Sequence, residues 1–315
     1  MIKSEICDLL NIEYPIFQGG MAWVADASLA SAVSNAGGLG LIAAMNSNGE
    51  QLRAEIRKAR QMTDKTFGVN IMLMSPSVEE VAKVVIEENI KVVTTGAGNP
   101  SRFMKDWIAA GIKVIPIVPS IAVAKLVEKN GAVAVVAEGC ESGGHVGELT
   151  TMALVPQIVD ALHIPVIAAG GIADGRQLAA ALMLGACGVQ LGTRFLVANE
   201  CTISKEYKQT VINARDISTT TTGKRLGHPV RAIKTPFLRE LIKLEYDTSV
   251  SLEELEKSGA GALRLAAREG DTEKGWFMAG QVAAMVTKEQ SCSEIITELF
   301  SEAEECLRGG LKWIK

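Results

Sequence analysis

The stretch KVIPIVPSIAVAKLVEKNGAVAVVAEG (residues 113–139) contains the pattern that decides the fold. An apolar run at 113–119 is followed by an amphipathic segment that begins at Ser120 and ends with an Asn-Gly pair at Asn130. A second apolar run follows at 132–139. Serine is a preferred first residue of a helix, and glycine commonly follows its last turn. The stretch therefore predicts a strand, a helix and a second strand.

The same unit recurs over the first two thirds of the chain. Eight apolar runs are strand candidates: YPIFQGG (14–20), GLGLIAA (38–44), FGVNIML (67–73), KVVTTGA (91–97), KVIPIVP (113–119), AVAVVAEG (132–139), PVIAAGG (165–171) and GVQLGTR (188–194). Seven amphipathic segments between them are helix candidates: 28–36, 49–62, 77–89, 101–110, 120–130, 150–162 and 174–184. The runs are continuous rather than alternating, as in a parallel sheet covered on both faces.

Eight such units predict an α/β fold of the (β/α)8 TIM-barrel type. An open doubly wound sheet is the alternative, but no GxGxxG follows the first run. The repeat stops near Asn199, so we expect residues 1–199, together with a helix within about 291–315, to form the barrel. Residues 200–290 are then a small, mainly helical appendage, with one helix expected at 251–267.

Composition excludes several classes of protein. Lys and Arg total 32 against 36 Asp and Glu, and this net charge of −4 favours neither nucleic acid nor an anionic membrane. No signal-peptide core and no long uncharged apolar run is present. Six cysteines without CxxC spacing and only three histidines argue against a metal site. We therefore expect a cytoplasmic protein with reduced thiols.

Two consecutive loops have the composition of a phosphate site. The seventh run leads through Gly170 and Gly171 to Asp174, which opens a helix, and the eighth ends in Gly192 and Thr193. The loops after strands seven and eight of a barrel commonly bind phosphate, and helix N-termini attract anions. The alternative is that these glycines are ordinary barrel turns. The absence of a GKS or GKT P-loop argues against a nucleoside triphosphate.

A phosphate at that rim indicates either a phosphorylated substrate or flavin mononucleotide (FMN). The bare segment QGGMA (18–22) can lie along a flavin ring, and the amides of Asn70 and Gln190 can bond the ring or its ribityl chain. The alternative for both amides is that they only satisfy backbone groups. A sugar-phosphate enzyme needs Lys, Asp or Glu at several strand ends, whereas only Glu138 qualifies.

The segment VVAEGCESGGHVGE (135–148) places His145 among glycines. A bare backbone lets a loop approach a cofactor, and an imidazole there can donate a hydrogen bond or a proton near neutral pH. The alternative is a histidine that only bonds the flavin or a neighbouring loop. Of the other histidines, His163 precedes the seventh strand and is expected to be structural, and the role of His228 is open.

At these residues the chain resembles the FMN-dependent enoyl-[acyl-carrier-protein] reductase II family, which shares a superfamily with nitronate monooxygenases. The motifs that carry the resemblance are QGGMAWVADASLASAVSNAGGLGLI (18–42), FGVNIML (67–73), VVTTGAGNP (92–100), VAEGCESGGHVGELTTMALVPQ (136–157), IAAGGIADGR (167–176) and GVQLGTRF (188–195). GGH and GGIADG are common to the superfamily, whereas GHPVRAIK (227–234) and GWFMAGQVA (275–283) favour the reductase.

The resemblance implies an FMN enzyme of fatty acid biosynthesis. It would reduce trans-2-enoyl thioesters on acyl carrier protein with NADH or NADPH, as a homodimer, and the appendage at 200–290 would lie on the substrate and nicotinamide side. Some members of the family are stimulated by a monovalent cation. His145 matches the catalytic histidine, and the FMN contacts would be Gly20, Met21, Ala22, Asn70, Glu138, Gly143, Gly170, Gly171, Gln190, Gly192 and Thr193. Three rivals remain: a nitronate monooxygenase using FMN and O2, a flavin-binding protein without turnover, and a sugar-phosphate or nucleotide enzyme that uses the same phosphate loops.

A cluster of basic residues lies in the predicted appendage. Acyl carrier proteins are acidic, so such a cluster would favour their encounter. It could also bind nicotinamide phosphates, or be a solvated face. Its members are Lys224, Arg225, Arg231, Lys234, Arg239 and Lys243.

Overall fold

The computed structural model describes residues 2–313, so the last two positions of the predicted 291–315 segment lie outside the described residues. It confirms the TIM barrel: each predicted run contains one parallel strand, and the order is β1-β9-β8-β6-β5-β4-β3-β2. A bridge between Phe17 and Leu39 joins β1 to β2 and closes the ring. The strands are β1 (Ile16–Gln18), β2 (Gly40–Ala43), β3 (Phe67–Met72), β4 (Val92–Gly96), β5 (Lys113–Val118), β6 (Val135–Glu138), β8 (Val166–Ala169) and β9 (Gly188–Leu191).

Helices follow the strands and cover the ring, as the amphipathic segments predict. They are α2 (Ala27–Asn35), α3 (Gly49–Met62), α4 (Val78–Glu87), α5 (Ser101–Ala109), α6 (Ile121–Lys129), α7 (Thr151–Ala161), α8 (Gly175–Met183) and the short α9 (Thr193–Leu196). One apolar core lies between strands and helices. A second core fills the ring, and Ile6 and Leu10 of α1 (Glu5–Leu10) close its amino-terminal end.

The appendage contains a small sheet that the sequence analysis did not predict. β10 (Thr219–Thr222) and β11 (Val230–Ile233) form a hairpin, and β11 also pairs with β7 (Gly144–His145), which belongs to the loop after β6. The expected helix at 251–267 is wrong, because the chain turns at Gly261 with φ +76°. The appendage helices are α10 (Lys205–Ile212), α11 (Pro236–Tyr246), α12 (Leu252–Gly259), α13 (Ala262–Arg264) and the π-helical η1 (Leu265–Glu269).

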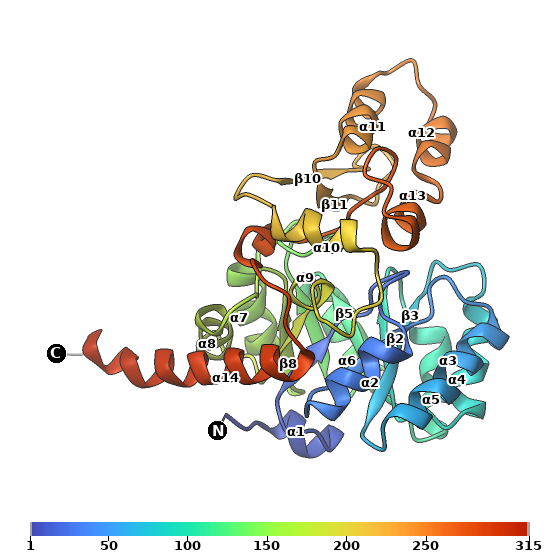
Figure 1. Cartoon of the computed structure of the whole chain (residues 1–315). Coiled ribbons are helices and arrows are strands. Elements are labelled where there is room, and N and C mark those ends of the chain that lie inside the picture. Colours follow the sequence, from blue (N-terminus) through green and yellow to red (C-terminus); the bar gives the residue numbers. More distant parts are fainter. Residues whose placement is uncertain (1, 314–315) are drawn as a thin grey trace.

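The chain then returns to the barrel. After the 3-10 turn η2 (Gln281–Met285), α14 (Cys292–Gly309) packs along α8 and α2, and η3 (Gly310–Trp313) follows. Figure 1 shows α14 in red beside the barrel, whereas α11 and α12 stand in orange above it. Across residues 2–313, the structure has no helix with the length and apolarity needed to cross a membrane.

Candidate active site

A cavity of about 720 Å³ opens where the barrel strands end, on the side of the appendage. Most of its wall comes from the loops after the strands, and the rest from the appendage. All twelve residues singled out in the sequence line it: Gly20, Met21, Ala22, Asn70, Glu138, Gly143, His145, Gly170, Gly171, Gln190, Gly192 and Thr193. His163, by contrast, is exposed just before β8, at the opposite end of the barrel. The barrel thus brings together residues that are spread over 174 positions (20 to 193) of the chain.

One end of the cavity has the features of an anion site. Gly170 and Gly171 adopt φ +89° and +71°, and a Cβ on Gly170 would lie 2.7 Å from a backbone oxygen. Within the described residues, the amides of Gly171, Gly192 and Thr193 donate to no protein acceptor. Three free N–H groups on close, glycine-rich backbone suit a phosphate.

The helix that follows these glycines is not part of that anion site, contrary to expectation. Asp174 accepts hydrogen bonds from Arg176 N and Gln177 N at 3.0 and 3.2 Å. Glu302 of α14 accepts one from Gly175 N at 2.9 Å. The first amides of α8 are therefore taken by carboxylates of the protein, and a phosphate would bind the glycine backbone instead.

The other end of the cavity offers amides to a planar ring. Gln190 is 5% exposed, and within residues 2–313 its Oε1 has no hydrogen-bond partner. Asn70 Nδ2 donates to Thr94 Oγ1 at 2.9 Å, so that amide is partly used by the barrel itself. A Cβ on Gly143 would lie 2.7 Å from the backbone of Ala279. The loop after β6 and the segment before η2 therefore approach each other closely here. An orphaned buried acceptor beside bare backbone fits the flavin that the sequence predicts.

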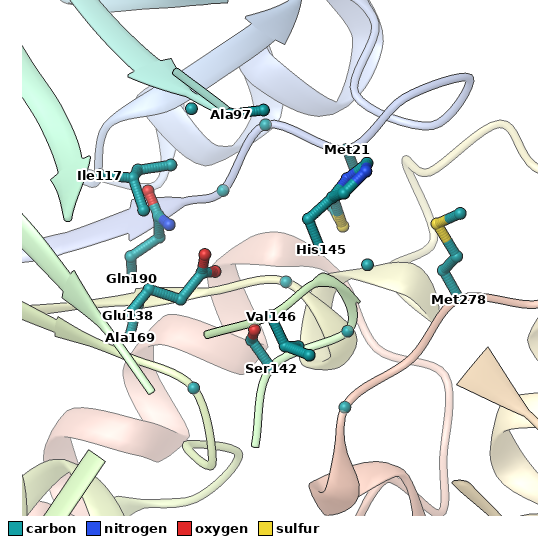
Figure 2. A pocket seen from close by; sticks show the side chains of 18 of the residues that line it. Met21, Ala97, Ile117, Glu138, Ser142, His145, Val146, Ala169, Gln190 and Met278 are labelled. Carbon is teal, nitrogen blue, oxygen red and sulfur yellow. The ribbon is translucent and has the colours of Figure 1, made fainter. Parts of the chain in front are cut away.

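Glu138 ends β6, and Ala169 of β8 lies between it and Gln190 of β9, so that all three strand ends border the cavity (Figure 2). Burial raises the pKa of its carboxyl to about 7, while the Ser142 hydroxyl acts in the opposite sense. A carboxyl with this pKa is protonated in about half the molecules at neutral pH and can then donate a hydrogen bond. Its strand-end position and its environment therefore mark it as more than a buried anion.

His145 points into the cavity near Met21 (Figure 2). Its strand β7 is two residues long, and within the described residues its pairing partner is β11 of the appendage, with His145 opposite Val230. Burial lowers the pKa of the imidazole, and the charge of His228 lowers it further. His145 is therefore a neutral N–H donor at neutral pH, held by a strand that comes 85 residues later (145 to 230) in the sequence.

The sequence analysis missed the residues that line the cavity from the appendage. Tyr207 donates its hydroxyl to Met278 O at 2.8 Å, and Thr193 Oγ1 accepts from Gly280 N at 2.8 Å. Both bonds hold the segment GWFMAGQVA (275–283) against the cavity. This motif is the sequence signal that could have indicated the contribution of the appendage to the cavity wall. The cavity wall is rich in flexible thioethers, from Met21, Met45, Met72, Met74 and Met278.

The basic cluster is not one free surface. Arg225 donates to the backbone carbonyls of Glu245, Asp247 and Val250 at 2.8–2.9 Å, so its guanidinium holds the appendage together. Arg231 is half-buried and its Nε donates to Cys140 O at 3.2 Å. The exposed members are Lys224, Lys234, Arg239 and Lys243.

Known proteins resemble this chain over its whole length. A family model described as nitronate monooxygenase matches residues 3–302. The solved structure of FabK from Thermotoga maritima has a TM-score of 0.97 and 45% sequence identity, covering 100% of both chains. A probable nitronate monooxygenase of Staphylococcus aureus is 32% identical, covering 97% of this chain and 99% of its own. The (3aS,4S,5R,7aS)-5-hydroxy-7a-methyl-1-oxo-octahydro-1H-indene-4-carboxyl-CoA dehydrogenase of Rhodococcus jostii is 31% identical, covering 96% of each.

Proposed function

The chain belongs to the nitronate monooxygenase family, whose members include flavin-dependent oxidoreductases, and from that premise we propose that it is an FMN-dependent enoyl-[acyl-carrier-protein] reductase. Its substrate is a trans-2-enoyl thioester on acyl carrier protein, and NADH or NADPH is the reductant. The observation that supports this choice is the likeness to FabK, which is 45% identical to this chain and matches it over 100% of both chains. The likeness includes the hairpin and the tail segment, which complete the cavity around His145.

The residues of the cavity suit this chemistry. When bound, FMN supplies hydride transfer, and the chain supplies binding and charge stabilisation. With FMN bound, the amides of Gly171, Gly192 and Thr193 would hold its phosphate, and Gln190 Oε1 would accept a hydrogen bond from its ring. The thioether wall excludes water and accommodates an apolar acyl chain.

His145 stabilises the charge that develops on the substrate. As a neutral imidazole it donates an N–H hydrogen bond to the thioester oxygen, on which negative charge grows when the β-carbon is reduced. Removal of one positioned donor of this kind lowers the rate by roughly 10²–10³. His145→Gln is therefore expected to lose that factor in kcat while retaining the flavin.

An anaerobic absorbance titration tests the function. The flavin band of the purified protein should bleach with NADH or NADPH, and a trans-2-enoyl thioester should then restore it stoichiometrically. Bleaching that persists until air is admitted contradicts the proposal.

The second candidate is nitronate monooxygenase activity, which the family model and the Staphylococcus aureus relative favour. It predicts rapid turnover of an alkyl nitronate with O2 in the absence of any nicotinamide. The reductase proposal predicts that this turnover is slow.

A further inference from the structure

The wall of the cavity differs between its two halves. The sheet order closes into a ring in which β3 and β4 stand opposite β8 and β9, the strands that precede the free amides. On the β3–β5 side the wall comes from the strand ends, the loops after them and α6, and its side chains are apolar apart from the amides of Asn70 and Asn99. The titratable side chains of the wall lie instead at the end of β6, in the loop after it, or in the appendage: Glu138, Glu141, His145, Tyr207 and His228. The side opposite the anion site therefore suits an uncharged, apolar group.

An apolar path leads from His145 into this side of the wall. A Cβ on Gly147, two residues after His145, would lie 3.1 Å from the Cβ of Pro119, so the histidine loop packs on the loop after β5. Val123 and Leu126 continue the wall, since residues three apart lie on one face of a helix and both belong to α6. The end of β5 and the first two turns of α6 therefore extend the cavity outward from the histidine.

The cavity wall reaches solvent on both sides of the histidine loop. On the appendage side, the exposed Gly227 lines the cavity from the turn between β10 and β11. On the apolar side, Leu126 is 41% exposed and Met74 is 59% exposed. Within residues 2–313, these two are the only exposed large apolar side chains that line the cavity. Exposed apolar surface that continues a ligand cavity is typical of a binding groove.

We infer that the acyl chain of the enoyl thioester runs along this path, over the end of β5 and the first two turns of α6, and that Leu126 helps to set the preferred chain length. The inference rests on the proposed function, from which the acyl chain is taken. The thioester then stands at His145, and its polar arm leaves on the appendage side, where the exposed Lys224 lies in the same turn as Gly227. A short chain stays near β5, whereas a longer chain covers Val123 and then Leu126 and removes them from water.

Saturated acyl-CoA thioesters test the path without turnover. Calorimetric titration of the FMN-loaded protein gives its affinity for butyryl-, octanoyl- and dodecanoyl-CoA, each below the concentration at which it forms micelles. A methylene group removed from water strengthens binding by up to about fourfold, so dodecanoyl-CoA should bind at least about a hundredfold more tightly than butyryl-CoA. Leu126→Glu places a charge in the path and should reduce that ratio by about tenfold, whereas Leu126→Met should retain it. Since every ligand carries the same CoA, any general effect of the new charge cancels in the ratio.

Ile108→Glu is the matched control. Ile108 is 40% exposed on the neighbouring helix α5 and does not line the cavity. The same charge is thereby introduced at a similarly exposed apolar position outside the path. The ratio of the two affinities should stay at its wild-type value in this variant.

Three results would overturn the inference. The first is a wild type that binds the three thioesters equally. The second is a Leu126→Glu variant that keeps the wild-type ratio; a loss in Met74→Glu instead would send the chain along the loop after β3. The third is an equal loss in Leu126→Glu and Ile108→Glu, which would indicate unspecific binding of the chain to the surface. Failure of the proposed function is read separately, as a reduced flavin that trans-2-butenoyl-CoA does not reoxidise, because the acyl-CoA affinities need no turnover.

Discussion

Replacement of Glu138 by Gln tests whether the cavity wall disfavours a charge. The carboxyl has its pKa raised by burial from 4.5 to about 7. The native protein therefore holds a proton between these pH values that the unfolded chain has already lost. Because the native state binds more protons, the stability contributed by Glu138 is full below pH 4.5 and falls as the pH rises toward 7.

The size of the effect follows from the two pKa values. The interval from 4.5 to about 7, at about 1.4 kcal/mol per pH unit, corresponds to a loss of about 3 kcal/mol in the free energy of unfolding. Glutamine has the shape of the protonated carboxyl and does not titrate. Glu138→Gln should therefore match the wild type at low pH and exceed its stability by up to about 3 kcal/mol at about pH 8.

Urea unfolding of the flavin-free proteins at several pH values between about 5 and 8 measures this difference. All other titrating groups are common to both proteins and cancel in the comparison. Glu273→Gln is the matched control for the chemical change itself, since Glu273 is exposed in the appendage and does not line the cavity. If the curves of wild type and Glu138→Gln run parallel, water in the cavity solvates the carboxylate and the reasoning fails.

Three further changes test other parts of the structure. Reversal of Lys224, Lys234 and Arg239 to Glu should raise KM for a carrier-bound substrate by about tenfold and leave KM for an enoyl-CoA unchanged; equal effects would exclude docking at this face. Burial would raise the pKa of Glu88, but hydrogen bonds from three arginines of α3 lower it overall. Glu88→Gln should therefore lower the free energy of unfolding in urea by about 1–2 kcal/mol at neutral pH, and by less in acid, where the wild-type carboxylate takes up a proton. Gly143→Ala should weaken flavin retention in equilibrium dialysis, since the added Cβ would lie 2.7 Å from the tail backbone.

Local patterns predict the barrel well because each unit encodes its own strand and helix. The helix 49–62 agrees with the structure to the residue, since Asn48 and Gln51 form a capping box at its start. The acceptors of the first backbone amides of α8 could not all be predicted from the local sequence. Their partner Glu302 is more than a hundred residues away and reaches Gly175 only because α14 packs on α8. The sequence thus indicates a helix N-terminus but not which acid occupies it.

The hairpin was missed for a related reason, and its absence from the prediction affects the site. The run TTTT (219–222) is β-branched, as strands favour, but the glycines and basic residues that follow it at 223–227 resemble those of a loop. β10 pairs with β11 along the chain, and β11 also pairs with the two residues of β7, which lie far away in the sequence. The GGH motif alone therefore does not determine where the His145 side chain points, because the backbone of His145 pairs with β11 of the appendage. A relative that shares the GGH motif but differs in the hairpin would hold this imidazole differently over the same barrel.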